Sequence, residues 1–286
     1  MTKKNNIVVV GAGTMGNGIA QTFAMKGHAV AMVDLDSTAL ERGMANIEKS
    51  LGRFLKKELM DQDSLDATLV RITTSNELTS AVKDADLVIE AVVENEKVKR
   101  AIFTQLDAEA PADAILASNT SRISITRIAQ ACSNPERVIG MHFMNPVPLM
   151  KLVEIIKGER TSAATLETTI LLAESLGKVV GIAEDYPGFI ANRILMPMIN
   201  EAAFALMEGV GTREAIDTTM KLGCNFPMGP LALADFIGLD ICVSILDVLH
   251  QGLGDPKYRC CPLLRRLVEA GKCGRKSGEG FYPYEG

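Results

Sequence analysis

A histidine and a glutamate on neighbouring apolar segments form the most chemically specific pair in this chain. His142 is one of only three histidines and lies in the apolar run Val138–Phe143, while Glu154 lies in the apolar run Met150–Ile156. Both runs are typical of strands, and the proline-containing stretch Asn145–Pro148 between them is typical of a turn. We therefore expect the two side chains to lie side by side, with the carboxylate orienting the imidazole as a general base for a hydroxyl group. The alternative is a half-buried histidine with a purely structural hydrogen bond.

A glycine-rich stretch after the first apolar run predicts a site for a nucleotide pyrophosphate. The apolar run Ile7–Val10 is typical of a buried strand, and Ile19–Met25 is typical of a helix. Between them stand Gly11, Ala12, Gly13, Thr14, Met15 and Gly16. In this pattern the first glycine permits a tight turn, the second lets the backbone approach the phosphates, and the third lets helix and strand pack closely. The phosphates would then face the N-terminus of the helix.

The next strand supports a dinucleotide as the ligand. The run Ala29–Val33 ends at Asp34, about twenty residues after the glycines, where a carboxylate binds the ribose 2′-hydroxyl. A carboxylate repels the 2′-phosphate of NADP. The sequence therefore favours NAD over NADP.

A basic face marks the long helix expected over Ser37–Leu59. Ser50, Arg53 and Lys57 are spaced so that they share one side of that helix. Such a face is ordinary solvated surface in many proteins, but it also suits the phosphates of a large acyl carrier. The residues alone leave both interpretations open.

Two further polar residues are expected at the carboxyl ends of strands, where doubly wound sheets bind their ligands. Glu94 follows the apolar run Leu87–Val92, and Ser121 follows the short run Ile115–Ala117. Both are therefore predicted to face the cofactor, although Ser121 is also a suitable N-cap for a helix beginning near Ile123. No histidine or acid neighbours Ser121 in sequence, which argues against serine nucleophile chemistry.

The pattern of elements predicts an α/β fold, with an N-terminal Rossmann-type doubly wound sheet followed by an all-α C-terminal domain. Residues 1–184 alternate strands and helices, with a polar turn expected over Asp61–Asp66, and residues 185–286 are predicted to be helical. A capped start at Asp185–Gly188 introduces a helix over Phe189–Glu208, and a single helix is expected over Leu231–Leu249. The first of these helices is apolar around most of its circumference, which predicts a subunit interface in the second domain.

The composition excludes several classes of protein. A net charge of −5 over 286 residues argues against a nucleic-acid surface, and no apolar run is long enough for a membrane span. The first residues, Met1–Asn6, have no signal-peptide pattern, so a cytoplasmic location is expected. Six cysteines occur without the spacing of a zinc site, and we expect reduced thiols and no bound metal.

Several stretches of the chain resemble one enzyme family over essentially its full length. They are Gly11–Gly16, Glu90–Asn95, Ser118–Ser121, His142–Glu154, Asp185–Arg193, Met228–Pro230 and Gly278–Tyr282. Together they are similar to the short-chain L-3-hydroxyacyl-CoA dehydrogenases. The stretches from His142 and from Asp185 are specific to that family, whereas the glycine loop is shared with many unrelated enzymes.

The resemblance implies hydride exchange between NAD and C3 of a 3-hydroxyacyl-CoA, with 3-hydroxybutyryl-CoA and acetoacetyl-CoA as the expected pair. It implies catalytic roles for His142 as base, Glu154 as its partner, Ser121, and Asn192 at the substrate carbonyl. Cofactor contacts are implied for the glycine loop and for Asp34, Glu94, Lys99, Ser121, Asn145 and Lys276, and coenzyme A contacts for Ser50, Lys57 and Ser121. A homodimer formed through the C-terminal domain is the expected assembly.

Two alternatives compete with this interpretation. A dehydrogenase of small free 3-hydroxyacids would share the first domain, but such enzymes typically carry a lysine where this chain has Asn192. A catalytically inactive nucleotide-binding protein would have lost His142 or Glu154, and both are present.

Overall fold

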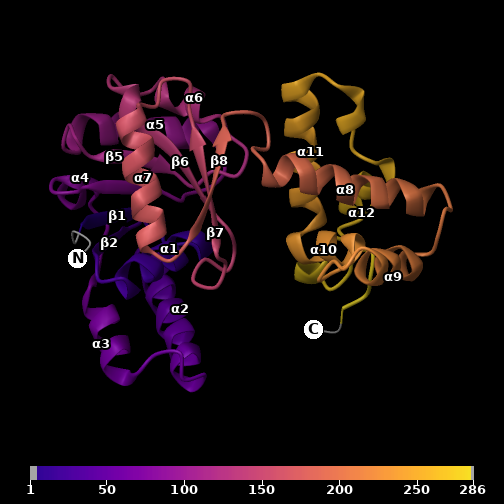
Figure 1. Ribbon diagram of the computed structural model, residues 1–286, viewed down its shortest axis with the longest axis horizontal. Helices are drawn as coiled ribbons and strands as arrows, with labels where there is room; N and C mark the ends of the chain where they lie inside the picture. The colour runs from indigo at the N-terminus through magenta and orange to yellow at the C-terminus, as the bar shows by residue number, and fades with distance from the viewer. Residues whose placement is uncertain (1–4, 285–286) are drawn as a thin grey trace. The chain divides into compact units, whose positions relative to one another are not determined.

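The computed structural model describes residues 5–284, which divide into two compact units, residues 5–186 and residues 187–284. Figure 1 shows the first unit as a sheet with helices and the second as helices alone. The residues Met1–Lys4, part of the stretch without a signal-peptide pattern, lie outside the described range. The predicted α/β fold with a helical second part is confirmed.

The first unit is built on one sheet of eight strands in the order β3-β2-β1-β4-β5-β6-β7-β8. Its strands are β1 Asn6–Val10, β2 Ala29–Val33, β3 Ile72–Ser75, β4 Leu87–Glu90, β5 Ile115–Ser118, β6 Val138–Phe143, β7 Leu152–Lys157 and β8 Val179–Glu184. All neighbouring pairs are parallel except β6 with β7. Because β1 pairs with both β2 and β4, the order reverses there, and this is where doubly wound sheets bind dinucleotides.

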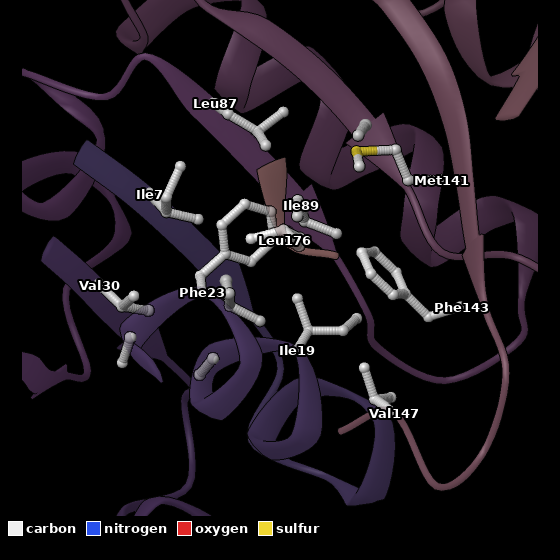
Figure 2. Packing of buried hydrophobic residues seen from close by; sticks show 14 of the residues in the cluster. Ile7, Ile19, Phe23, Val30, Leu87, Ile89, Met141, Phe143, Val147 and Leu176 are labelled. Atoms are coloured by element: carbon white, nitrogen blue, oxygen red, sulfur yellow. The ribbon is translucent and has the colours of Figure 1, made fainter. Parts of the chain in front are cut away.

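Seven helices and one 3₁₀ turn accompany the sheet in the described part of the first unit. They are α1 Thr14–Met25, α2 Ser37–Lys56, α3 Gln62–Val70, α4 Leu78–Val82, α5 Glu96–Glu109, α6 Ile125–Ala129, η1 Pro135–Arg137 and α7 Ala163–Ser175. Side chains from α1, α2 and α7 join the strands in one buried apolar cluster, in which Phe23 and Phe143 meet edge to face (Figure 2). Strand residues whose side chains point to the opposite face of the sheet, such as Val8 and Leu116, are buried as well, as expected for a sheet covered on both faces.

The second unit packs its helices around a separate core. Its elements are α8 Ala191–Met207, α9 Arg213–Gly223, α10 Pro230–Ile237, α11 Leu239–Leu253, η2 Pro256–Tyr258, α12 Pro262–Glu269 and η3 Arg275–Ser277. Fully buried side chains include Ile199, Leu231 and Leu246. Within residues 5–284, no helix has the length and apolar character needed to cross a membrane.

Three local predictions were wrong. The stretch Asp61–Asp66 is the start of α3 rather than a turn, because the Asp61 carboxylate accepts a hydrogen bond from the Ser64 N–H and caps that helix. The helix expected over Leu231–Leu249 is broken at Gly238, which has φ of 105°, and becomes α10 and α11.

The third correction concerns Asp185. Its carboxylate does not cap α8, whose N-cap residue Ile190 makes no side-chain capping bond. Instead it accepts hydrogen bonds from the Ser124 hydroxyl at 2.6 Å and from the backbone N–H groups of Ile125 and Thr126. Asp185 therefore ties the end of the first unit to the start of α6.

Candidate active site

The antiparallel pairing of β6 with β7 places His142 directly opposite Glu154. Their side chains meet with His142 Nδ1 at 2.8 Å from Glu154 Oε2, and they are only 10% and 2% exposed. A carboxylate on Nδ1 holds that nitrogen as the donor and leaves Nε2 as the atom able to accept a proton. The expectation that the two side chains are neighbours is confirmed.

A buried lysine holds the turn between these two strands. Lys178 is buried, and its ammonium donates to the carbonyl oxygens of Val147 at 2.6 Å and Met150 at 2.7 Å. Burial and the nearby Lys26 ammonium lower the pKa of Lys178. The lysine therefore helps to hold the turn between β6 and β7 in place, a role for which the sequence offered no signal. Asn145, in the same turn, is exposed.

The glycine loop has the geometry expected for a pyrophosphate cradle. Gly11 has φ of 108°, a conformation that favours glycine. A Cβ on Gly16 would stand 1.8 Å from the Gly11 carbonyl oxygen, so only glycine allows this close packing. Apart from Gly13 and its two chain neighbours, no described residue has an atom within 4 Å of the position that a Cβ on Gly13 would take, and Gly13 and Thr14 are exposed.

The N-terminus of α1 follows directly on this loop. Its N-cap residue is Gly13, which makes no side-chain capping bond, so the N-cap does not occupy the N–H groups of the first turn. Asp34 flanks the loop at the end of β2, where its carboxylate accepts the Ala12 N–H at 2.8 Å. The loop, the helix N-terminus and Asp34 thus form one continuous edge suited to a nucleotide.

Glu94 and Ser121 come together at the carboxyl ends of β4 and β5. Glu94 Oε1 accepts the Ser121 N–H at 2.9 Å and the Thr120 hydroxyl at 2.5 Å. Burial opposes ionisation of Glu94, but the Lys99 ammonium and these hydrogen bonds outweigh it and lower the pKa of its carboxyl. The N-cap of α6 is Ser124 rather than Ser121, so the alternative role considered for Ser121 is wrong.

Lys99 lies beneath Glu94 rather than on the surface. Its side chain is 1% exposed, and its ammonium pairs with Glu90 at 2.7 Å and with Glu94 at 3.3 Å. Sequence reasoning missed Glu90 as part of the site, although a carboxylate ending an otherwise apolar strand was a signal for it. It also missed Asn119, whose side-chain oxygen accepts the Phe143 N–H at 2.9 Å and so joins the end of β5 to the strand of the histidine.

The remaining residues proposed for the site belong to α2 and to the second unit. Ser50 is half-buried near the end of α2, and Lys57 is the exposed C-cap residue of that helix. Asn192 and Lys276 belong to the second unit. There Asn192 is buried in the first turn of α8, and the Lys276 ammonium pairs with Asp240 at 2.6 Å. Between residues 5 and 284, no group of three or more histidine, cysteine or acidic residues is arranged to hold a metal ion.

Comparison with known proteins covers both units. The family model for the NAD binding domain of 3-hydroxyacyl-CoA dehydrogenase matches residues 6–186, and the model for the C-terminal domain of the same family matches residues 188–284. The 3-hydroxybutyryl-CoA dehydrogenase of Bradyrhizobium diazoefficiens is 54% identical over 278 residues, which are 97% of this chain and 94% of that protein.

Relatives with lower sequence identity also match nearly the full chain. The mitochondrial hydroxyacyl-coenzyme A dehydrogenase of Homo sapiens is 43% identical over 286 residues, covering 98% of this chain and 91% of the human protein. Among solved structures, (S)-3-hydroxybutyryl-CoA dehydrogenase PaaH1 from Ralstonia eutropha has a TM-score of 0.96 and 47% identity, covering 99% of this chain and 100% of that one.

Proposed function

The chain belongs to the 3-hydroxyacyl-CoA dehydrogenase family and is an NAD-dependent oxidoreductase, and we propose that it interconverts (S)-3-hydroxybutyryl-CoA and acetoacetyl-CoA. The observation that carries the proposed chemistry is the 2.8 Å contact between His142 Nδ1 and Glu154. NAD supplies the hydride acceptor at its nicotinamide, or the donor when reduced. The protein must then accept the proton of the C3 hydroxyl, or donate it in the reverse direction.

In the oxidation direction, His142 Nε2 accepts that proton while hydride leaves C3. The histidine becomes an imidazolium, and the buried Glu154 carboxylate stabilises the new charge. In the reverse direction the imidazolium returns the proton to the developing alkoxide. Because both side chains are almost fully buried, little water is present to screen their interaction.

The residues of the first unit fit NAD. The open space beside Gly13 and the uncapped N-terminus of α1 suit a pyrophosphate, and Asp34 suits the adenosine ribose. We propose that Glu94, Ser121 and Asn145 contact the nicotinamide half, with Lys99 acting through Glu94. We further propose Asn192 and Ser121 as contacts to the substrate and Lys276 as a contact to the cofactor.

The reaction is tested with purified protein, acetoacetyl-CoA and NADH, by following nicotinamide absorbance. Rapid NADH oxidation is expected with the thioester and none with free acetoacetate. Oxidation of NADH by the free acid alone would instead support the alternative of a dehydrogenase for small 3-hydroxyacids. No oxidation with either would leave the inactive nucleotide-binding protein as the remaining alternative.

Cofactor choice provides a second prediction. We expect kcat/KM with NADPH to be at least about a hundredfold below that with NADH, because the Asp34 carboxylate would face a 2′-phosphate. The substitution Asp34→Ser should reduce this difference, mainly by lowering kcat/KM with NADH. Equal efficiency with both cofactors in the unmodified protein would show that Asp34 does not contact the ribose.

The basic C-terminal end of α2 provides a third prediction. We propose that Ser50 and Lys57 bind coenzyme A, so Lys57→Gln should raise the KM for acetoacetyl-CoA about three- to tenfold and leave kcat nearly unchanged. Lys49, which is also exposed on α2, provides the matched control Lys49→Gln, with no change in KM expected. An equal effect of both substitutions would indicate general charge attraction rather than a defined contact.

Assembly and location are also proposals. A homodimer through the second unit is supported by apolar side chains that α8 leaves exposed, such as Ile194 at 67%. A cytoplasmic location is supported by the six cysteines, all of which are free thiols in the described range.

A further inference from the structure

A buried carboxylate lies at the end of β4 and is fully hydrogen-bonded. Glu90 is completely buried, and its Oε1 accepts bonds from the Val92 N–H and the Lys99 ammonium, each at 2.7 Å. Its Oε2 accepts the Ser118 hydroxyl, also at 2.7 Å. Every one of these partners is a donor, which is the arrangement that an ionised carboxylate requires. Glu90 therefore carries a negative charge inside the protein.

Lys99 extends this arrangement to Glu94. Its ammonium lies between the two carboxylates, and Glu94 is further stabilised as an anion by bonds from Thr120 and Ser121. We call Glu90, Lys99 and Glu94 the Glu90 network. Two carboxylates and one ammonium leave one net negative charge. Because Glu90 and Lys99 are at most 1% exposed, this charge is only weakly screened by solvent.

The Glu90 network lies at the part of the sheet that the nicotinamide would occupy. The strand order reverses between β1 and β4, and a bound dinucleotide spans this point. Asp34, on the β2 side, takes the adenosine ribose in the proposed function, so the nicotinamide half must extend over β4 and β5. Glu90 ends β4, and Glu94 is bonded to the Ser121 segment after β5.

We propose that the net negative charge of the Glu90 network sets the relative affinity of the site for oxidised and reduced cofactor, in favour of NAD⁺. This inference rests on the proposed binding of NAD in the first unit. The nicotinamide ring carries a positive charge in NAD⁺ and none in NADH, while the remainder of the cofactor is the same. A buried negative charge therefore stabilises the oxidised form selectively. On the enzyme, it shifts the equilibrium toward NAD⁺ and the 3-hydroxyacyl thioester.

The test is the ratio of the dissociation constants for NAD⁺ and NADH, measured by titration in the absence of acyl-CoA. The substitution Glu90→Gln keeps the shape of the side chain and removes one charge. We expect it to raise the dissociation constant for NAD⁺ relative to that for NADH by about fivefold or more, which is the effect of a partly screened unit charge at short range. Glu94→Gln, at a side chain that is 24% exposed, should move the ratio in the same direction.

The matched control is Glu109→Gln. Glu109 is the last residue of α5, the helix that carries Lys99 near its start, and it accepts hydrogen bonds from Gln105. Its substitution also removes one negative charge, and we expect the ratio to stay unchanged. If the role of Glu90 were merely structural, Glu90→Gln would lower the affinity for NAD⁺ and the affinity for NADH equally. An unchanged ratio of the two dissociation constants in both Glu90→Gln and Glu94→Gln would overturn the inference. If Glu90→Gln does not fold, Glu94→Gln decides it alone. Failure of the unmodified protein to bind either form would contradict the proposed function itself.

Discussion

Replacement of His142 by glutamine is expected to lower the turnover of acetoacetyl-CoA between about a hundredfold and ten-thousandfold, while the dissociation constant for NADH changes little. Glutamine can still donate a hydrogen bond to the Glu154 carboxylate, but it cannot accept and return a proton. The cofactor elements, from Gly11 to Asp34, lie on other strands and helices and are left intact. Steady-state kinetics and NADH titration of the same preparation separate the two effects.

Glu154→Gln is the companion substitution. It preserves the shape of the side chain but removes the charge that stabilises the imidazolium, so a large loss of turnover is again expected, smaller than that of His142→Gln. If the two side chains act as one unit, the double variant should be scarcely slower than His142→Gln alone. Turnover at the unmodified rate in either single variant would show that the pair does not carry the proton.

The second large effect is expected from Gly13→Ala. Apart from Gly13 and its chain neighbours, no described residue has an atom within 4 Å of a Cβ at this position, and φ is −64°, which alanine adopts readily. The melting temperature should therefore stay the same or rise slightly. NADH affinity, in contrast, should fall by at least about a hundredfold, because the new methyl group occupies the space that the pyrophosphate needs.

Gly52 provides the matched control for this substitution. It lies inside α2, and apart from its chain neighbours and the nearby backbone of α2 no described atom is within 4 Å of the position that its Cβ would take. Gly52→Ala should therefore raise the free energy of unfolding by up to about 1 kcal/mol without affecting NADH binding. Calorimetry and NADH titration of both variants provide the comparison. Normal NADH binding by Gly13→Ala would mean that the cofactor does not approach the backbone at this loop.

Much of the first unit could be predicted because most of its strands are short and mainly apolar and several of its turns contain glycine or proline. The neighbouring positions of His142 and Glu154 followed from two such strands joined by a proline turn. The resemblance to the family, carried by several stretches in context, is confirmed by the match of both family models.

The elements that escaped prediction depend on contacts between distant residues. The stretch from Asp185 is typical of a capped helix start, yet the Asp185 carboxylate binds the start of α6, which is 60 residues away from it along the chain. Glu90, Lys99 and Ser118 form hydrogen bonds across a strand, a helix and a second strand, a combination that no local pattern specifies. Propensity also could not indicate that Gly238 would adopt positive φ and divide an apolar helix into two.

The most direct test of hydride exchange at C3 uses NADH carrying deuterium at C4 of the nicotinamide, in the position from which hydride leaves. Acetoacetyl-CoA is reduced with this cofactor, and the thioester product is analysed by mass spectrometry and by proton magnetic resonance. The proposed function predicts 3-hydroxybutyryl-CoA with one deuterium, located at C3, in an amount equal to the NADH consumed. Consumption of NADH without deuterium at C3 of the product would contradict it.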